Sequence, residues 1–94
     1  MSDYHLYKEK TNAQIEEWEA DLKKLQAQAK QKDADEKIRL EEKIEMLEKK
    51  LDKGKSRFNE LKESGEEAWE TMKGGLDEAW KDLSSSFKEA KGKF

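Results

Sequence analysis

Few side chains in this sequence could bind a metal ion or take part in a reaction. His5 is the only histidine and cysteine is absent, so a transition-metal site would need further ligands around His5. Acidic pairs at Glu16-Glu17, Glu41-Glu42 and Glu66-Glu67 have oxygen atoms of the kind that Ca²⁺ binds and that acid–base catalysis uses. None of them lies in a calcium-loop pattern or beside a nucleophile, so we interpret all three as solvated helix surface.

Basic residues gather in the middle of the chain, at Lys49, Lys50, Lys53, Lys55 and Arg57. Such a cluster could bind phosphate or anionic lipid, and the glycine, lysine and serine at 54–56 resemble the end of a phosphate-binding loop. The upstream glycine of that loop is missing, and no strand is predicted before it. The acidic segment 41–48 supplies the opposite charge, so the basic cluster can be explained without a ligand. Because none of these candidate sites is complete, we predict no enzyme activity and no cofactor.

The composition favours long helices over disorder. Charged residues make up 46% and hydrophobic residues 33% of the 94 residues, which suits either state. Proline is absent and the aromatic residues recur at helical spacing, so helix is favoured. The net charge of −3 gives no basic surface for nucleic acid. No secretory signal or apolar run of roughly 20 residues occurs, so we expect a cytoplasmic protein.

A heptad seam, in which apolar residues alternate spacings of three and four, predicts one long helix over about residues 10–62. A capping box at 11–14 marks its expected start, with Tyr4 and Tyr7 just upstream. Polar residues occupy the seam between 26 and 37, but its phase continues through them. The seam consists of Thr11, Ile15, Trp18, Leu22, Leu25, Ala29, Leu40, Ile44, Leu47, Leu51, Gly54, Phe58 and Leu61.

An 11-residue repeat predicts a second helix over about residues 65–94. Its clearest mark is Glu-Ala-Trp at 67–69 and again at 78–80, and eleven residues close three helical turns. Ser64-Gly65 is the expected break before this helix, because glycine can end one helix and serine can cap the next. The apolar stripe is too narrow to bury itself, so the helix needs a partner. The stripe consists of Trp69, Met72, Leu76, Trp80, Leu83, Phe87 and Phe94.

Blocks of opposite charge predict antiparallel pairing of the long segment about residue 36. Between 16 and 32 an acidic block precedes a basic one, and the order repeats between 41 and 57. Pairing residues whose numbers total 72 or 73 places acidic blocks opposite basic ones, and such charges select orientation and register. The same pairing puts Trp18 against Gly54, the largest side chain against the smallest residue.

Two architectures would share these contacts. A hairpin that turns near Asp35, and two continuous helices that cross antiparallel about Glu36, are related as in a domain swap. Short helix–helix loops make the hairpin feasible, but residues 33–37 contain neither glycine nor proline. We therefore favour the continuous helix, about 80 Å long at 1.5 Å per residue.

The tryptophan stripe also has two interpretations. An amphipathic 11-residue repeat can lie in a membrane interface, as apolipoprotein-like helices do, or pack against another helix. Small residues border the stripe at Ala68, Ala79 and Ala90, and acids outnumber lysines in this segment. A close helix neighbour is therefore favoured over an anionic lipid surface.

Two runs of sequence carry a resemblance to a known family. AQIEEWEADLKKL at 13–25 and SGEEAWETMKGGLDEAW at 64–80 are similar to sequences of a family of small, largely uncharacterised bacterial coiled-coil proteins. The similarity spans nearly the whole chain, and the spaced Glu-Ala-Trp repeat is its most specific mark. The resemblance implies a helical fold and a bacterial origin. It implies no activity, cofactor or catalytic residue.

We therefore expect an all-α, single-domain protein over residues 1–94, in which long amphipathic helices form an antiparallel coiled coil or helical bundle. The predicted function is structural, namely non-enzymatic self-association into a homo-oligomeric bundle or filament-like assembly. A peripheral lipid or membrane-surface binder is the alternative, and an adaptor that docks another protein through the tryptophan stripe is a third. The expected interface consists of Ile15, Trp18, Leu22, Leu25, Leu47, Leu51, Gly54, Phe58, Leu61, Trp69, Met72, Leu76, Trp80, Leu83 and Phe87.

Overall fold

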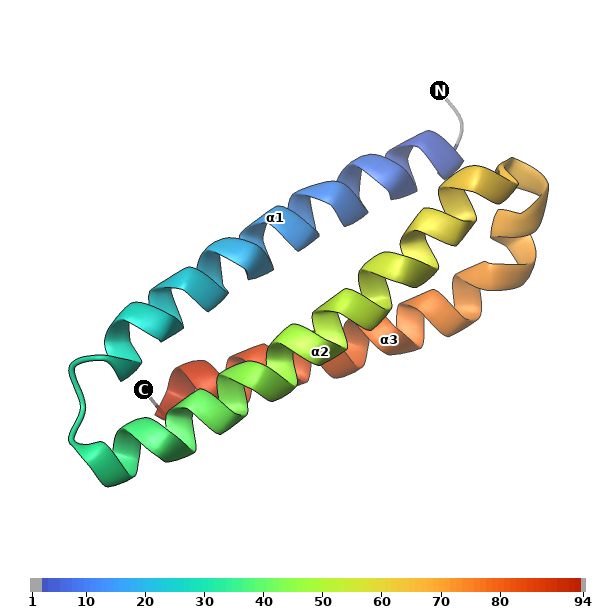
Figure 1. Cartoon of the computed structure of the whole chain (residues 1–94). Helices are drawn as coiled ribbons and strands as arrows, with labels where there is room; N and C mark the ends of the chain where they lie inside the picture. The colour runs from blue at the N-terminus through green and yellow to red at the C-terminus, as the bar shows by residue number, and fades with distance from the viewer. Residues whose placement is uncertain (1–2, 94) are drawn as a thin grey trace.

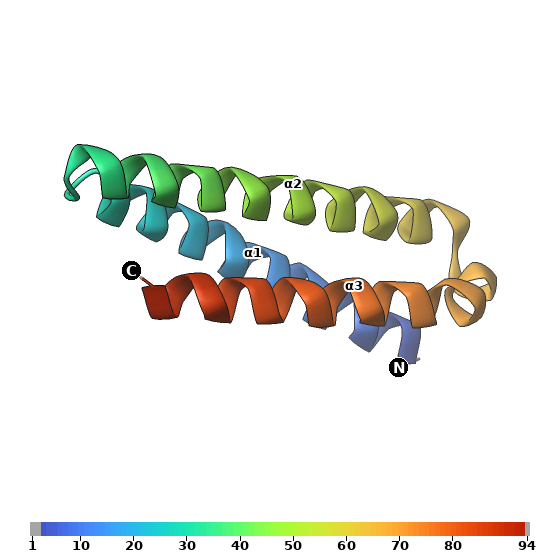
Figure 2. The ribbon, with the colours of Figure 1, turned by 90° about the horizontal axis from the view of Figure 1, so that it is seen from below.

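Three helices form an elongated bundle in the computed structural model, which describes residues 3–93 (Figure 1). Helix α1 covers Asp3–Ala29, α2 covers Ala34–Ser64 and α3 covers Glu66–Lys93, and no strand occurs in this part of the chain. The predicted all-α bundle is confirmed. The bundle measures 50 × 20 × 19 Å. Helix α1 begins at one end of the long axis of the bundle, and α3 finishes at the opposite end (Figure 2).

The chain turns between α1 and α2, so the continuous helix that we expected over 10–62 is wrong. The Lys30 N–H still donates to the Gln26 carbonyl at 3.3 Å, and Asp33 then caps α2 by accepting from the Glu36 N–H at 3.0 Å. In a single chain, a straight helix of this length would leave its apolar seam exposed throughout. Folding back buries the seams of both halves against each other.

Helix α1 begins at Asp3 rather than near residue 10, which corrects the predicted start. Thr11, the expected capping residue, lies inside the helix and is buried. Tyr4 is buried as well, and its hydroxyl donates to the Leu61 carbonyl at 3.4 Å. Tyr4 and Thr11 are seven residues apart, so the heptad seam extends through the segment that the capping box was expected to exclude.

Contacts between α1 and α2 confirm the antiparallel pairing. The Gln26 amide donates to the Glu48 carboxylate at 2.7 Å, and the Lys55 ammonium lies 3.6 Å from the Glu19 carboxylate. The residue numbers in both pairs total 74, against the predicted 72 or 73. The charge blocks therefore indicated the orientation and nearly the register of the hairpin.

Gly65 alone connects α2 to α3 and confirms the predicted break. Its φ of 83° and ψ of −172° lie in a region that essentially only glycine occupies. Its N–H donates to the Leu61 carbonyl at 3.0 Å, which satisfies one of the last carbonyls of α2. Gly74 and Gly75 lie within α3 and do not end it.

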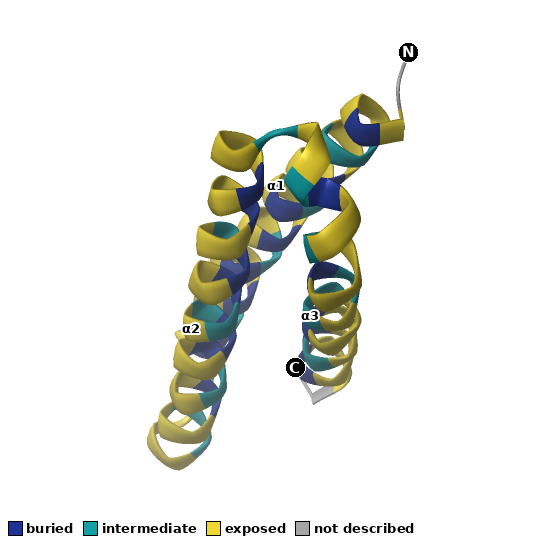
Figure 3. Cartoon of the chain, turned by 90° about the vertical axis from the view of Figure 1, so that its right-hand side faces the viewer, coloured by how far each residue is buried: buried dark blue, intermediate teal, exposed yellow. Residues whose placement is uncertain are grey.

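The core lies where the three helices face one another (Figure 3). Helix α2 packs along both other helices, whereas the backbones of α1 and α3 lie farther apart. The stripe of α3 was expected to need another chain, but the hairpin of the same chain covers it. Trp69, Leu76, Leu83 and Phe87 are buried, and Met72 and Trp80 are partly buried. Phe94 lies outside the described residues.

Candidate functional site

The residues with ionisable side chains form no metal site within residues 3–93, where no group of three or more His, Asp or Glu is close enough to hold an ion. The glycine, lysine and serine at 54–56 lie inside α2, so their backbone N–H groups face along the helix rather than toward a phosphate. Three lysines of the basic cluster on α2 pair with acids, one on each helix: Lys49 with Glu45, Lys50 with Asp82, and Lys55 with Glu19.

The residues predicted to form an interface between chains meet inside one chain. All are buried except Met72 and Trp80, which are partly buried. The interface prediction omitted four buried residues that the predicted seam included, namely Thr11, Ala29, Leu40 and Ile44. Neither the interface nor the seam included Tyr4 and Ala90, which are buried, or Tyr7, which packs against the core. The spacing of seven between Tyr4 and Thr11 was the available signal for Tyr4. Tyr7 lies three residues after Tyr4 and four before Thr11, so the same spacing was available for it, although its ring partner Trp69 comes from α3.

Aromatic side chains join α1 to α3. Trp18 stacks on Phe87 with ring centroids 5.6 Å apart, and the Trp80 ring lies 5.5 Å from that of Trp18. Nearer the start of α1, the centroid of the Trp69 ring lies 6.0 Å from that of Tyr4 and 5.9 Å from that of Tyr7. Aromatic pairs at such distances contribute about 0.5–1.5 kcal/mol beyond the area that they bury. These rings fill the space that separates the two backbones.

Side chains of α3 pack on Gly54. A Cβ atom on Gly54 would lie 2.9 Å from Cζ3 of Trp80 and 3.2 Å from Cδ1 of Leu83. The sequence predicted that Trp18 of α1 would pack on this glycine. That prediction considered two helices only, whereas the atoms nearest to Gly54 come from the third.

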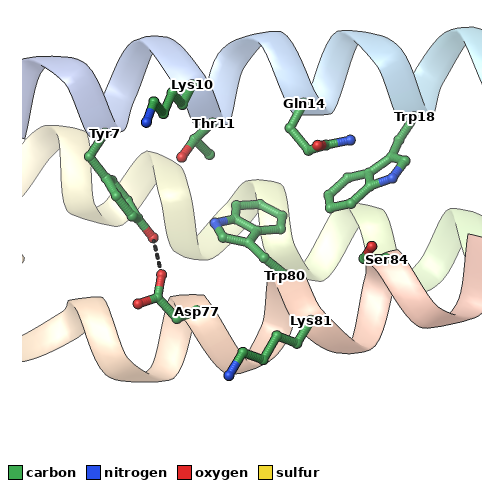
Figure 4. A pocket seen from close by; sticks show the side chains of 9 residues that line it. All are labelled: Tyr7, Lys10, Thr11, Gln14, Trp18, Asp77, Trp80, Lys81 and Ser84. Atoms are coloured by element: carbon green, nitrogen blue, oxygen red, sulfur yellow. Dashed lines mark hydrogen bonds between the residues drawn. The ribbon is translucent and has the colours of Figure 1, made fainter.

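A hollow of about 460 Å³ lies between α1 and α3, and we call it the α1/α3 groove (Figure 4). Its lining residues recur at spacings of three and four along each helix, so each helix contributes one row. The Tyr7 hydroxyl donates across the groove to the Asp77 carboxylate at 3.4 Å. The groove is lined by Tyr7, Lys10, Thr11, Gln14 and Trp18 of α1 and by Asp77, Trp80, Lys81 and Ser84 of α3.

Burial in the groove raises the pKa of the Tyr7 phenol above its usual value. The Trp80 N–H and the Thr11 hydroxyl work against this shift, and the negative charge of Asp77 adds to it. The phenol is therefore a neutral hydrogen-bond donor at neutral pH. The Trp80 Nε1 atom is buried and has no hydrogen-bond partner of standard geometry, although it lies close enough to Tyr7 to affect its pKa.

Comparison with known proteins identifies no relative. No family model, curated protein or solved structure matches the chain. Within residues 3–93, no helix has the length and apolar character needed to cross a bilayer. Two features of the fold bear on function, the connection at 30–33 and the α1/α3 groove.

Proposed function

We propose that this chain is a non-enzymatic structural protein that self-associates into homo-oligomers by exchanging α1 between chains. The observation that carries the proposal is the connection at 30–33, which contains neither glycine nor proline and through which the heptad phase continues. A helix continued through this segment would keep both seams on one face. Two such chains crossing antiparallel would make between chains the contacts that α1 now makes within one.

The contacts available for exchange join α1 to both other helices. They include the stacking of Trp18 on Phe87, the Gln26–Glu48 hydrogen bond and the Glu19–Lys55 ion pair. An ion pair also joins Asp21 to Lys91, whose charged atoms lie 2.8 Å apart. Because the same contacts form in either state, the difference in free energy lies mainly in the connection and in the entropy of association. The dimer fraction should therefore depend strongly on protein concentration.

Exchange also accounts for both forms of assembly that the sequence predicted. Two chains that exchange α1 with each other close into a dimer, whereas exchange passed on to a third chain gives an open, filament-like series. The lipid-binding alternative relied on the tryptophan stripe. Trp69, Leu76 and Phe87 are buried in the bundle, so contact with a membrane through them would require α3 to leave it.

Asp33→Ala should shift the equilibrium toward the exchanged dimer. The variant loses the side chain that accepts from the Glu36 N–H and caps α2, an interaction that contributes about 1 kcal/mol to each hairpin. One dimer replaces two hairpins, so its dissociation constant should fall by roughly 30-fold. Sedimentation from micromolar to millimolar protein should show more of a species at twice the 11.0 kDa chain mass.

Asp35→Ala is the matched control, because it removes the same charge from the first turn of α2 but not the cap. It should change the dimer fraction much less. A flexible Gly/Ser insertion after Gln31 should favour the hairpin and deplete the dimer. A mass of 11.0 kDa at every concentration, in the wild type and in Asp33→Ala, would contradict self-association. If the dimer persists after the insertion, the chains associate through a surface other than the exchanged α1, and the exchange proposal is wrong.

A further inference from the structure

We propose that the α1/α3 groove binds an apolar monocarboxylate, a small molecule with a hydrocarbon body and one carboxylate group. This inference does not depend on the exchange of α1. It is based on the size of the groove, on the indole rings that line it and on its charge.

The dimensions of the groove fit a small molecule rather than a helix. Its volume of about 460 Å³ lies within the range of roughly 300–1,000 Å³ that is usual for small-molecule sites. The Tyr7–Asp77 hydrogen bond crosses it, and the Trp18 and Trp80 rings lie 5.5 Å apart farther along. A partner helix with side chains is about 10 Å wide and would have to break these cross-connections. The faces of the indole rings provide an apolar surface for a hydrocarbon body.

The charges that line the groove favour an anion. Lys10 and Lys81 lie on opposite walls, and neither forms an ion pair with another residue in the part of the chain that the structure describes. The one acid in the lining, Asp77, already accepts from Tyr7. Two lysines against one carboxylate give a local positive excess in a protein whose net charge is −3. A carboxylate would compensate this excess.

The polar head of the ligand belongs at the Lys10 ammonium. The Trp80 Nε1 atom is buried and lies close to the Tyr7 phenol, so it is closed to a molecule in the groove (Figure 4). A carboxylate beside Lys10 would gain an ion pair, and the face of the Trp80 ring would contact the hydrocarbon body.

Decanoate, decanol and decylamine distinguish head-group recognition from simple hydrophobic binding. Titration calorimetry below the micelle-forming concentration, together with tryptophan emission, should show that decanoate binds at least about threefold more tightly than either of the others. Lys10→Gln and Lys81→Gln should each weaken decanoate binding by roughly two- to fivefold and leave decanol binding unchanged. Lys49→Gln is the matched control, because it removes the same charge from an exposed site on α2.

Ser84→Phe tests the place of binding independently of charge. Ser84 is exposed at the rim of the groove, so the larger ring should fill the hollow without disturbing the core and should abolish decanoate binding. The proposal is overturned by equal affinities for the three probes, by the absence of decanoate binding, or by tighter binding of decylamine. It is also overturned if Lys49→Gln weakens binding as much as Lys10→Gln does, or if Ser84→Phe binds like the wild type.

Discussion

Replacing Phe87 by alanine should lower the free energy of unfolding by about 3–5 kcal/mol. Phe87 is 2% exposed and stacks on Trp18, so its truncation leaves a cavity where α1 and α3 meet. Small domains have a total stability of about 5–15 kcal/mol, so the loss would be a large part of it. Urea denaturation followed by circular dichroism measures the change. Tryptophan emission should also move to longer wavelength, because Trp18 becomes more accessible to water.

Met46→Ala is the matched control for this substitution. Met46 is 54% exposed on α2, so its truncation should change the free energy of unfolding by no more than about 0.5 kcal/mol. If Phe87→Ala were as mild as Met46→Ala, α3 would not be packed on the hairpin in solution. The tryptophan stripe would then be free to make contacts with other molecules.

Gly54→Leu should destabilise the bundle by about 1–3 kcal/mol, because it overfills a packed layer. Its Cβ alone would lie 2.9 Å from Cζ3 of Trp80, closer than side chains pack. A loss of 1 kcal/mol lowers the melting temperature of a domain of this size by roughly 4–8 °C, which thermal unfolding resolves. Gly74→Leu is the control. Nothing lies within 4 Å of the Cβ position at Gly74, so the better helix former should stabilise α3 there.

A second substitution identifies which tryptophan covers Gly54. Trp80→Ala removes the ring nearest to that position, so combining it with Gly54→Leu should cost less than the sum of the two single changes. If Trp18 covered Gly54 instead, the effects of Gly54→Leu and Trp80→Ala would add. Unfolding free energies of the wild type, the two single variants and the double variant complete the test.

The sequence predicted the buried helix faces and the antiparallel pairing because heptad spacing and charge blocks are local patterns. Leu22, Leu25, Leu47 and Leu51 were placed on buried faces by spacing alone, and all four are buried. The break at Gly65 was also visible, because few other residues adopt its backbone conformation. These predictions required only the periodicity of a helix and the conformational range of glycine.

What could not be predicted depends on how three helices meet. Spacing within a helix cannot show whether Trp18 or Trp80 reaches Gly54, because both lie on correctly oriented stripes. The connection at 30–33 has no turn residues, so the sequence did not reveal that the chain folds back there. The α1/α3 groove brings together residues about 70 positions apart, such as Tyr7 and Asp77. No local sequence pattern shows that residues so far apart in the chain lie close together.

An odd number of antiparallel helices also determines how the bundle would respond to tension. Because α1 begins and α3 ends at opposite ends of the long axis, a pull on the two helix termini acts along the helices (Figure 2). The helices would then slide past one another, and the layers of the core would bear the load together instead of opening one after another. We expect single-molecule stretching to record one rupture of the whole bundle, whereas stepwise opening would contradict this. Under tension along its axis, the bundle would therefore keep its length until the whole core gives way.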